Sequence, residues 1–138
     1  MYLLDTNVVS ELRRAQTGKA KPNVVKWAAS VQPEMLYLSV ISVLEIETGI
    51  LLMERRDLNQ GALLRRWLEE QVLPTFDRRI LPVDVAVARK CAELHVPDRR
   101  SERDAMIAAT ALIHRMKVVT RNVSDFDQST AEIINPWV

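Results

Sequence analysis

Short apolar runs alternate with longer amphipathic stretches along this chain. The apolar runs have the length of β-strands, and they cover residues 2–4, 36–39, 80–81, 117–120 and 132–134. The longer stretches carry apolar residues at helical spacing and predict helices over 8–14, 22–31, 42–55, 58–73, 86–95 and 101–116. Pro22 suits the first turn of a helix and Asp57 suits an N-cap, which supports two of these starts.

Alternating strands and helices predict an α/β fold in which helices cover a short, mostly parallel sheet. At 138 residues and 48% hydrophobic, the chain has the size of one ordinary domain, and we expect a single domain over residues 1–138. Segment 15–21 is the one loop that the sequence marks as flexible.

Two of the predicted helices follow each other directly and form a predicted antiparallel hairpin, joined at Arg56 and Asp57. Their apolar faces consist of Ile46, Ile50 and Met53 on the first helix and Leu64, Trp67 and Leu68 on the second. These faces either pack on the sheet or contact a partner. Glu47 lies within the first stripe, so it needs an arginine across the hairpin or a dimer contact.

The net charge of +1 argues against a strongly basic nucleic-acid binder, although arginines cluster locally. The only cysteine, Cys91, cannot form an internal disulfide, and the N-terminus lacks the pattern of a secretory signal. We therefore expect a reducing compartment, most simply the cytoplasm. The longest apolar run, residues 35–44, is far shorter than the roughly 20 residues that span a bilayer, so we expect no membrane segment.

Asp5 directly follows the first predicted strand. Reactive groups of open α/β sheets gather at the carboxyl ends of the strands, so Asp5 is a candidate site residue. Helix capping is the competing interpretation, because Asp5, Thr6 or Asn7 can each accept a hydrogen bond from the start of the next helix.

Asp104 has the same ambiguity. Ser101 and Asp104 have the spacing of a capping box. Asp104 also shares a helical face with the apolar residues Ile107, Ala108 and Ala111, which predicts a carboxylate that points inward.

Glu45 lies off the apolar stripe of its predicted helix. It can face solvent, or it can face a cleft at the helix start, where Gly49 leaves room for another backbone. A third polar segment, Thr120 to Asn122 with Asp125 close behind, ends the fourth strand, and an ordinary turn is the alternative there.

Several segments together resemble a known family. They are LLDTNVVSE, SVISVLEIETGI, DAMIAATA and VVTRNVSDF, followed by INPW at the end. Their order and spacing closely resemble the PIN-domain ribonucleases, especially the VapC toxins of bacterial toxin–antitoxin pairs and their FitB-like branch. The likeness spans essentially the whole chain. It implies a three-layer α/β/α fold and Mg²⁺- or Mn²⁺-dependent endoribonuclease activity that leaves 5′-phosphate and 3′-hydroxyl ends.

The resemblance also implies the site residues. It makes Asp5, Glu45 and Asp104 catalytic, metal-binding acids. The fourth acid departs from the family pattern, because some relatives have Asp where this chain has Asn122, while others use the acid of an Asp-Phe pair, here Asp125. Asp125 is therefore the expected fourth acid. The polar residues expected to orient the substrate are Thr6, Asn7, Thr120 and Asn122.

The residue types fit such a site. Two carboxylates about 4 Å apart repel each other by roughly 4 kcal/mol at an effective dielectric constant of 20, and a cation relieves that repulsion. Oxygen ligands suit Mg²⁺ or Mn²⁺. A zinc site would have few ligands to draw on, because the chain has only Cys91, His95 and His114. Both histidines are predicted to lie at helix C-termini. The hypothesis is phosphodiester hydrolysis by a metal-activated water without a covalent enzyme intermediate.

Partners follow from the same resemblance. RNA would be held through its phosphates by Arg13, Arg99, Arg100 and Arg121. Toxins of this type form dimers, and a cognate antitoxin silences them with a tail across the acidic pocket, in assemblies that bind operator DNA through the antitoxin. An apolar groove beside the acids is therefore expected, with Trp27 or Trp67 as candidate linings, although core packing is the default for both.

Two other functions compete with this one. Haloacid-dehalogenase-type phosphotransferases also place an Asp after the first strand, but they need a second Asp two residues on, where this chain has Asn7. The stronger alternative is a catalytically weak module of the same fold, which binds nucleic acid through an antitoxin complex and whose acids only cap helices. Asn122, where some relatives have Asp, keeps this alternative open.

Overall fold

The computed structural model of the chain describes residues 1–126 and 131–138. Its strands are β1 (Tyr2–Leu4), β2 (Leu36–Ser39), β3 (Ile80–Leu81), β4 (Lys117–Val119) and β5 (Ile133–Ile134). Its α-helices are α1 (Thr6–Arg13), α2 (Pro22–Ala29), α3 (Val40–Arg56), α4 (Leu58–Trp67), α5 (Leu73–Thr75), α6 (Val85–Leu94) and α7 (Glu102–His114). Shorter turns are η1 (Arg14–Thr17), η2 (Pro33–Met35), the π-helix η3 (Leu68–Val72) and η4 (Val123–Asp125). None of these helices is long and apolar enough to cross a membrane.

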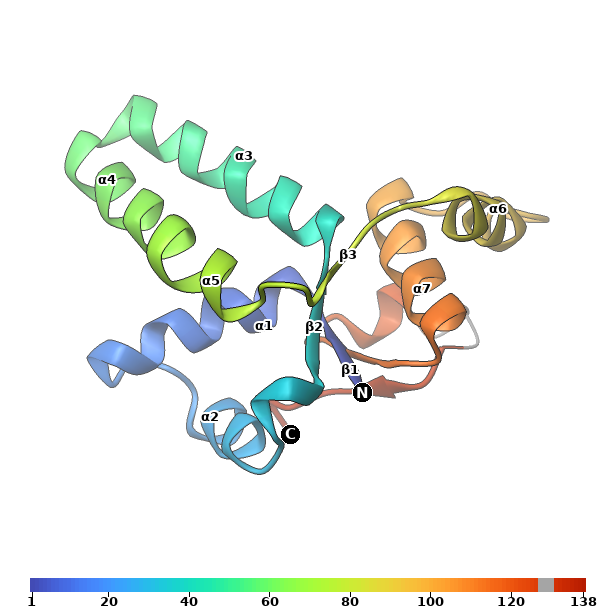
Figure 1. Cartoon of the computed structure of the whole chain (residues 1–138), viewed down its shortest axis with the longest axis horizontal. Helices are drawn as coiled ribbons and strands as arrows, with labels where there is room; N and C mark the ends of the chain where they lie inside the picture. Colours follow the sequence, from blue (N-terminus) through green and yellow to red (C-terminus); the bar gives the residue numbers. More distant parts are fainter. Residues whose placement is uncertain (127–130) are drawn as a thin grey trace.

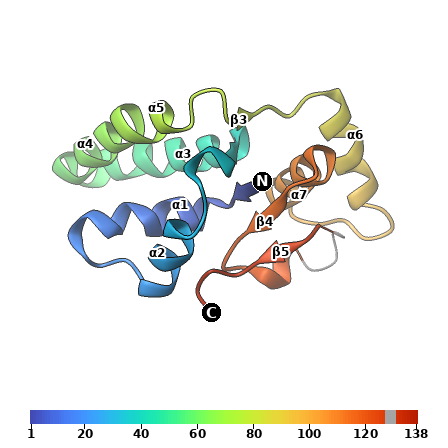
Figure 2. The same cartoon turned by 60° about the horizontal axis from the view of Figure 1, so that its bottom comes forward.

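The five strands form one sheet in the order β3-β2-β1-β4-β5, and every neighbouring pair is parallel. Helices α1 to α5 lie on one side of the sheet, and α6 and α7 lie on the other (Figures 1 and 2). This arrangement confirms the predicted three-layer α/β/α fold. The sheet is parallel throughout the described residues, where the sequence predicted it to be mostly so.

Alternation along the strands produces one core on each face of the sheet. Leu4, Leu38 and Val119 face the layer of α1 to α5. Leu3 and Val118 face the opposite layer and pack with the apolar side of α7. All five side chains are fully buried. A parallel sheet covered on both sides is apolar on both faces, so polar groups gather where its strands end.

The start of α3 differs from the prediction. The helix begins at Val40 rather than at residue 42, because Ser39 at the end of β2 caps it. The Ser39 hydroxyl accepts the backbone N–H of Ile41 at 3.0 Å. Ser42, where the predicted helix began, is a buried residue inside the first turn of α3.

The predicted helix over 58–73 is divided into α4, η3 and α5. The widened π-turn directly precedes Pro74, where Leu73 N–H bonds to the Leu68 carbonyl five residues back. Proline has no N–H to donate, and its ring clashes with the carbonyl four residues back, so a regular α-helix cannot continue through it.

Segment 15–21, predicted as a flexible loop, is anchored at both ends. It begins inside η1, which Gly18 ends with a φ of 70°, a left-handed conformation that glycine adopts readily. It ends at Lys21, whose N–H donates to Glu11 Oε2 at 2.8 Å.

Helices α3 and α4 form the predicted hairpin, and Arg65 is the arginine across it. Arg65 pairs with Glu47 and, at 3.1 Å, with Glu54. This pairing confirms the first of the two explanations for Glu47. Ile46 and Ile50 are buried in the core, so the apolar stripe of α3 packs on the sheet.

Gly61 allows α4 to approach α3 closely. A Cβ at this position would lie 2.7 Å from the Cα and 2.9 Å from the backbone N of Glu54. Gly61→Ala is expected to lower the free energy of unfolding by about 1–3 kcal/mol, because the backbone of α3 has to move. Gly49→Ala is the matched control, since a Cβ there meets nothing within 4 Å and alanine in a helix gains about 0.5–1 kcal/mol over glycine. Urea unfolding measures both, and a stable Gly61→Ala protein would contradict the close approach.

Candidate active site

The carboxyl ends of the central strands bring polar residues to one edge of the sheet. Asp5 follows β1 and Thr120 follows β4, and because these strands are parallel neighbours the two residues leave the sheet side by side. The Asp5 N–H continues the pairing by donating to the Val119 carbonyl at 2.9 Å. Glu45 from α3 and Asp104 from the first turn of α7 join this edge from two helices.

Asp5 caps a helix and also belongs to a buried polar network. One carboxylate oxygen accepts the backbone N–H of Thr6, at the start of α1, at 2.8 Å. The other accepts the Thr120 hydroxyl at 2.7 Å and Asn7 Nδ2 at 3.2 Å. The residue is only 6% exposed. Capping is thus confirmed, but it occupies one oxygen of the carboxylate and leaves the other to the polar network.

Thr120 is the centre of this network. It is fully buried, and its hydroxyl accepts the Asn122 N–H at 3.0 Å and Asn7 Nδ2 at 3.4 Å. Asn7 in turn accepts the Arg121 N–H on Oδ1 at 3.3 Å. These bonds fix the segment after β4 against the start of α1.

Glu45 points into the site. Its Oε1 accepts the Thr6 hydroxyl at 2.7 Å, and its Oε2 lies 3.8 Å from Nη1 of Arg103. Its side chain is only 28% exposed, which excludes the alternative of an ordinary solvent-facing glutamate. Gly49 leaves open space as expected, and among the described residues nothing outside its own helix lies within 4 Å of where its Cβ would be. Beside Glu45 a cavity of about 260 Å³ lies between α1 and the hairpin, and Gly49 is part of its lining.

Asp104 faces the same site from α7. The predicted capping box does not form, because the Ser101 side chain makes no cap hydrogen bond to the helix and instead bonds the Asp104 carboxylate. Burial raises the pKa of Asp104 to about 6. Nearby negative charges add to this shift, namely those of Asp125, Asp5 and Glu45. The inward direction predicted from its helical face is consistent with these neighbours.

Burial also raises the pKa of Asp5 above its usual range. Hydrogen bonds from Thr120 and Thr6 act in the opposite direction, and the charges of Glu45 and Asp125 raise the pKa further. We call Asp5, Glu45, Asp104 and Asp125 the acid cluster. Its members come from four separate segments and share one electrostatic field.

The acid cluster offers only oxygen donors, which suit a hard divalent cation. Over residues 1–126 and 131–138, no three Asp, Glu, His or Cys side chains are placed to hold an ion directly. Mg²⁺ commonly binds one or two carboxylates and keeps several waters, so Asp5 and Asp104 fit as its holders with the other acids reached through water. The two histidines end α6 and α7, as predicted, and His95 Nδ1 accepts the Arg100 N–H at 3.0 Å.

Comparison with known protein families decides the class of this fold. The PIN domain profile matches residues 2–129. The chain belongs to the PIN-domain family.

Relatives of this PIN domain share nearly its whole length. VapC ribonuclease Y4jK of Sinorhizobium fredii is 39% identical over 145 residues, which cover 99% of this chain and 98% of that protein. Toxin FitB of Neisseria gonorrhoeae is 39% identical over 144 residues, which cover 99% of each chain. The solved structure of FitAB bound to an IR36 DNA fragment matches with a TM-score of 0.88 and 36% identity, covering 100% of this chain and 96% of that one.

In this PIN domain the two candidates for the fourth acidic position differ in how they reach the cluster. Asp125, in η4, raises the pKa of both Asp5 and Asp104 through its charge. Asn122 contacts Thr120 through its backbone N–H. The electrostatic coupling favours Asp125 as the fourth acid.

Arg103 is the site residue that the sequence did not single out. Its contact with Glu45 joins α7 to α3. From the sequence Arg103 was one member of a basic cluster, and only its position directly before Asp104 connects it with the site.

Proposed function

We propose that this PIN domain is a divalent-cation-dependent endoribonuclease and the toxin of a toxin–antitoxin pair. The proposal rests on the acid cluster, whose four carboxylates act on one another at the carboxyl edge of the sheet. Bringing like charges together in a partly buried site costs free energy, and a bound cation offsets that cost. The relatives named VapC ribonuclease and Toxin FitB support the activity and the role.

The residues of this chain have distinct roles in the proposed reaction. Asp5 and Asp104 would hold the cation, and Glu45 and Asp125 would be reached through its bound waters. A bound Mg²⁺ or Mn²⁺ supplies activation of the attacking water and neutralises charge that develops on the phosphate. The polar side chains of Thr6, Asn7, Thr120 and Asn122 orient the acids and the substrate. Their hydrogen bonds fix the direction of each carboxylate, as outer contacts do at metal sites generally.

RNA has to approach an edge of the sheet that carries four acids. Because these acids repel the phosphates, basic side chains near the site are required. Arg13, Arg99 and Arg121 are exposed and Arg100 is half-buried; these residues supply the phosphate contacts. Binding is then sensitive to salt although the net charge of the chain is only +1.

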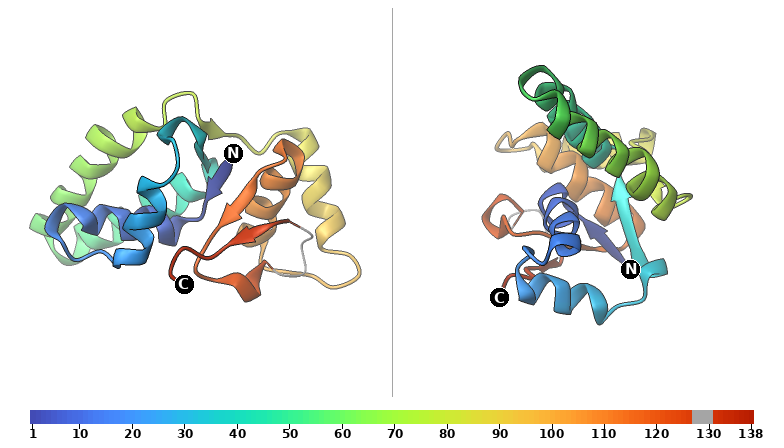
Figure 3. Two further views of the ribbon diagram at one scale, coloured as in Figure 1. Left: turned by 90° about the horizontal axis from the view of Figure 1, so that it is seen from below. Right: turned by 90° about the vertical axis from the view of Figure 1, so that its left-hand side faces the viewer.

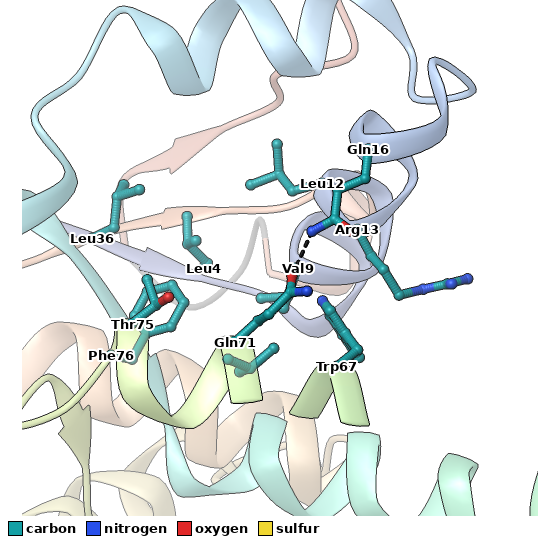
Figure 4. Close-up of a pocket in the computed structure, with 11 residues that line it drawn as sticks. Leu4, Val9, Leu12, Arg13, Gln16, Leu36, Trp67, Gln71, Thr75 and Phe76 are labelled. Atoms are coloured by element: carbon teal, nitrogen blue, oxygen red, sulfur yellow. Dashed lines mark hydrogen bonds between the residues drawn. The ribbon is translucent and has the colours of Figure 1, made fainter. Parts of the chain in front are cut away.

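A groove beside the acids fits the tail of an antitoxin. A cavity of about 230 Å³ lies between α1 and the helices after the hairpin turn, lined by Leu4, Val9, Leu12, Trp67 and Phe76 among others (Figure 4). Trp67 and Arg13 also line the cavity that Glu45 lines, so the two cavities are adjacent at these residues. An apolar tail lying in this groove reaches the acids and blocks RNA.

Larger assembly belongs to the same proposal. Exposed leucines on the outer side of the hairpin, Leu44, Leu51, Leu52, Leu58 and Leu63, support a homodimer. The relative solved as FitAB bound to DNA supports a toxin–antitoxin complex that contacts operator DNA through the antitoxin.

One observation favours the alternative of a catalytically weak module that binds nucleic acid through an antitoxin complex. In the described part of the chain, no three potential ligands are placed to hold an ion directly. In that case the acids serve as caps and structural groups.

Purified protein incubated with labelled single-stranded RNA separates the two functions. Cleavage is expected with Mg²⁺ or Mn²⁺, absent with EDTA and absent in Asp104→Asn, with 5′-phosphate ends on the products. Expression of the wild-type chain should arrest growth, and the small protein encoded beside it should restore growth. Folded protein that binds the cation and leaves RNA intact would contradict the nuclease and favour the module.

A further inference from the structure

The INPW segment at the end of the chain lies beside the acidic site. β4 and β5 are parallel neighbours, and they run side by side in Figure 3. The Thr120 N–H extends their pairing by donating to the Ile134 carbonyl at 2.9 Å. The segments that follow the two strands therefore leave the sheet together, which brings Arg121 next to Trp137. The Arg121 guanidinium carbon lies 5.7 Å from the centre of the Trp137 ring.

Hydrogen bonds of its backbone fix the position of Trp137. Its N–H donates to Asn135 Oδ1 at 2.9 Å, and its carbonyl accepts Asn23 Nδ2 from α2 at 3.1 Å. Its ring is partly buried against the core on the α1 to α5 side. The ring is thus a fixed platform beneath the Arg121 side chain.

Arg121 combines a fixed backbone with an exposed charge. Its N–H bonds to Asn7, which also contacts the Asp5 carboxylate, so its backbone belongs to the network of the acid cluster. The residue is exposed, and among the described residues no carboxylate lies within ion-pair distance of its guanidinium. A guanidinium held over an aromatic ring by a cation–π contact keeps its planar set of N–H donors, which can bind a phosphate as a fork.

We infer that Arg121 and Trp137 form a phosphate-binding subsite for the nucleotide next to the one that is cleaved. The inference rests on the proposed function. The acid cluster repels every phosphate except the one facing its cation, so the neighbouring phosphate needs a positive group of its own. Arg103 already pairs with Glu45 at 3.8 Å. Among the described residues, Arg121 is the cation that directly follows Thr120, and its backbone bonds to Asn7 of the site. The cation–π contact with Trp137 restricts the Arg121 side chain, which reduces the entropy that it loses when it binds a phosphate.

Binding and cleavage of a short single-stranded RNA test the subsite. Binding is measured in Asp104→Asn protein, which is expected not to cleave the RNA. Adding Arg121→Ala is expected to weaken binding roughly tenfold and to reduce the slope of log K against log salt by about 0.7, the share of one phosphate contact. Arg121→Lys keeps the charge and should lose less. Arg56→Ala, which removes the same charge at the far end of α3, should change neither quantity.

In the cleaving wild-type background, Arg121→Ala should raise KM with kcat within about twofold, because it removes a contact that substrate and transition state share. Trp137→Leu should raise KM less than Arg121→Ala does, and Trp137→Phe should have a KM close to that of wild type. Thermal unfolding checks that both Trp137 variants fold.

Unchanged RNA binding in Arg121→Ala would overturn the subsite and leave the ribonuclease proposal intact. Weakened binding of the neighbouring small protein with normal RNA binding would also overturn it, and would assign Arg121 to the antitoxin. Wild-type protein that binds RNA through Arg121 but never cleaves it would defeat the proposed activity and support the subsite.

Discussion

Replacing Asp5 with asparagine is expected to lower RNA cleavage more than about 100-fold while the protein stays folded. Asparagine is as good an N-cap as aspartate, so the oxygen that accepts the Thr6 N–H is retained. The change removes the negative charge that the proposed cation requires. It also relieves a buried carboxylate whose pKa is raised, and this gain offsets the loss of the two bonds that the second oxygen accepts, from the Thr120 hydroxyl and from Asn7. The free energy of unfolding should therefore change by less than about 1 kcal/mol.

Alanine at position 5 separates the two roles of Asp5. It removes the cap and leaves the Thr120 hydroxyl without its acceptor, so Asp5→Ala should lose cleavage and also about 1–2 kcal/mol of stability. Asp84 is the matched control, because it caps α6 by accepting the Val87 N–H at 3.0 Å and takes no part in the acid cluster. Asp84→Ala should cost a similar amount of stability and leave cleavage unchanged. Wild-type cleavage by Asp5→Asn would reduce Asp5 to a helix cap.

The positions of the strands, and the face of the sheet to which each strand residue points, were predictable because both depend only on the local pattern of residues. Leu3 and Leu4 point to opposite cores, so a short apolar run that ends at a polar residue already predicts a central strand with a site candidate behind it. Asp5 and Thr120 follow from the same rule, since parallel neighbours end at one edge. Neither inference needs knowledge of how the helices pack.

The missed features depend on tertiary contacts. The sequence predicted that Glu47 needs an arginine across the hairpin or a dimer contact, and only the register of the hairpin decides that its partner is Arg65. The pattern from Ser101 to Asp104 matches a capping box, yet Asp104 faces three other acids, and Ser101 is used to hydrogen-bond its carboxylate instead. A local rule fails here because the electrostatic environment of the site is made by distant segments.

Asp104→Asn is expected to abolish cleavage and, in EDTA above pH 6, to make the protein more stable by about 1 kcal/mol. The folded-state pKa is about 6, above the ordinary value of 3.8, so the native protein binds this proton more tightly than the unfolded chain does. The ionised carboxylate therefore costs stability, a cost that is absent below pH 4, grows between pH 4 and 6, and is complete above pH 6. Asp104 is half-buried, and screening by solvent keeps the cost well below what its pKa alone implies.

Urea unfolding at pH 4 and pH 7.5, with EDTA or with Mg²⁺, tests this coupling between stability and function. In EDTA the advantage of Asp104→Asn should appear at pH 7.5 and vanish at pH 4. Mg²⁺ should reverse the order at pH 7.5, because an ion at 100 times its Kd adds about 2.7 kcal/mol to the protein that binds it and little to the variant. Glu102→Gln removes the same charge two residues before Asp104, where Glu102 pairs with Arg99 at 3.7 Å outside the acid cluster, and should gain nothing. Equal stability of wild type and Asp104→Asn under all four conditions would show that Asp104 neither experiences the repulsion of the acid cluster nor contributes to holding an ion.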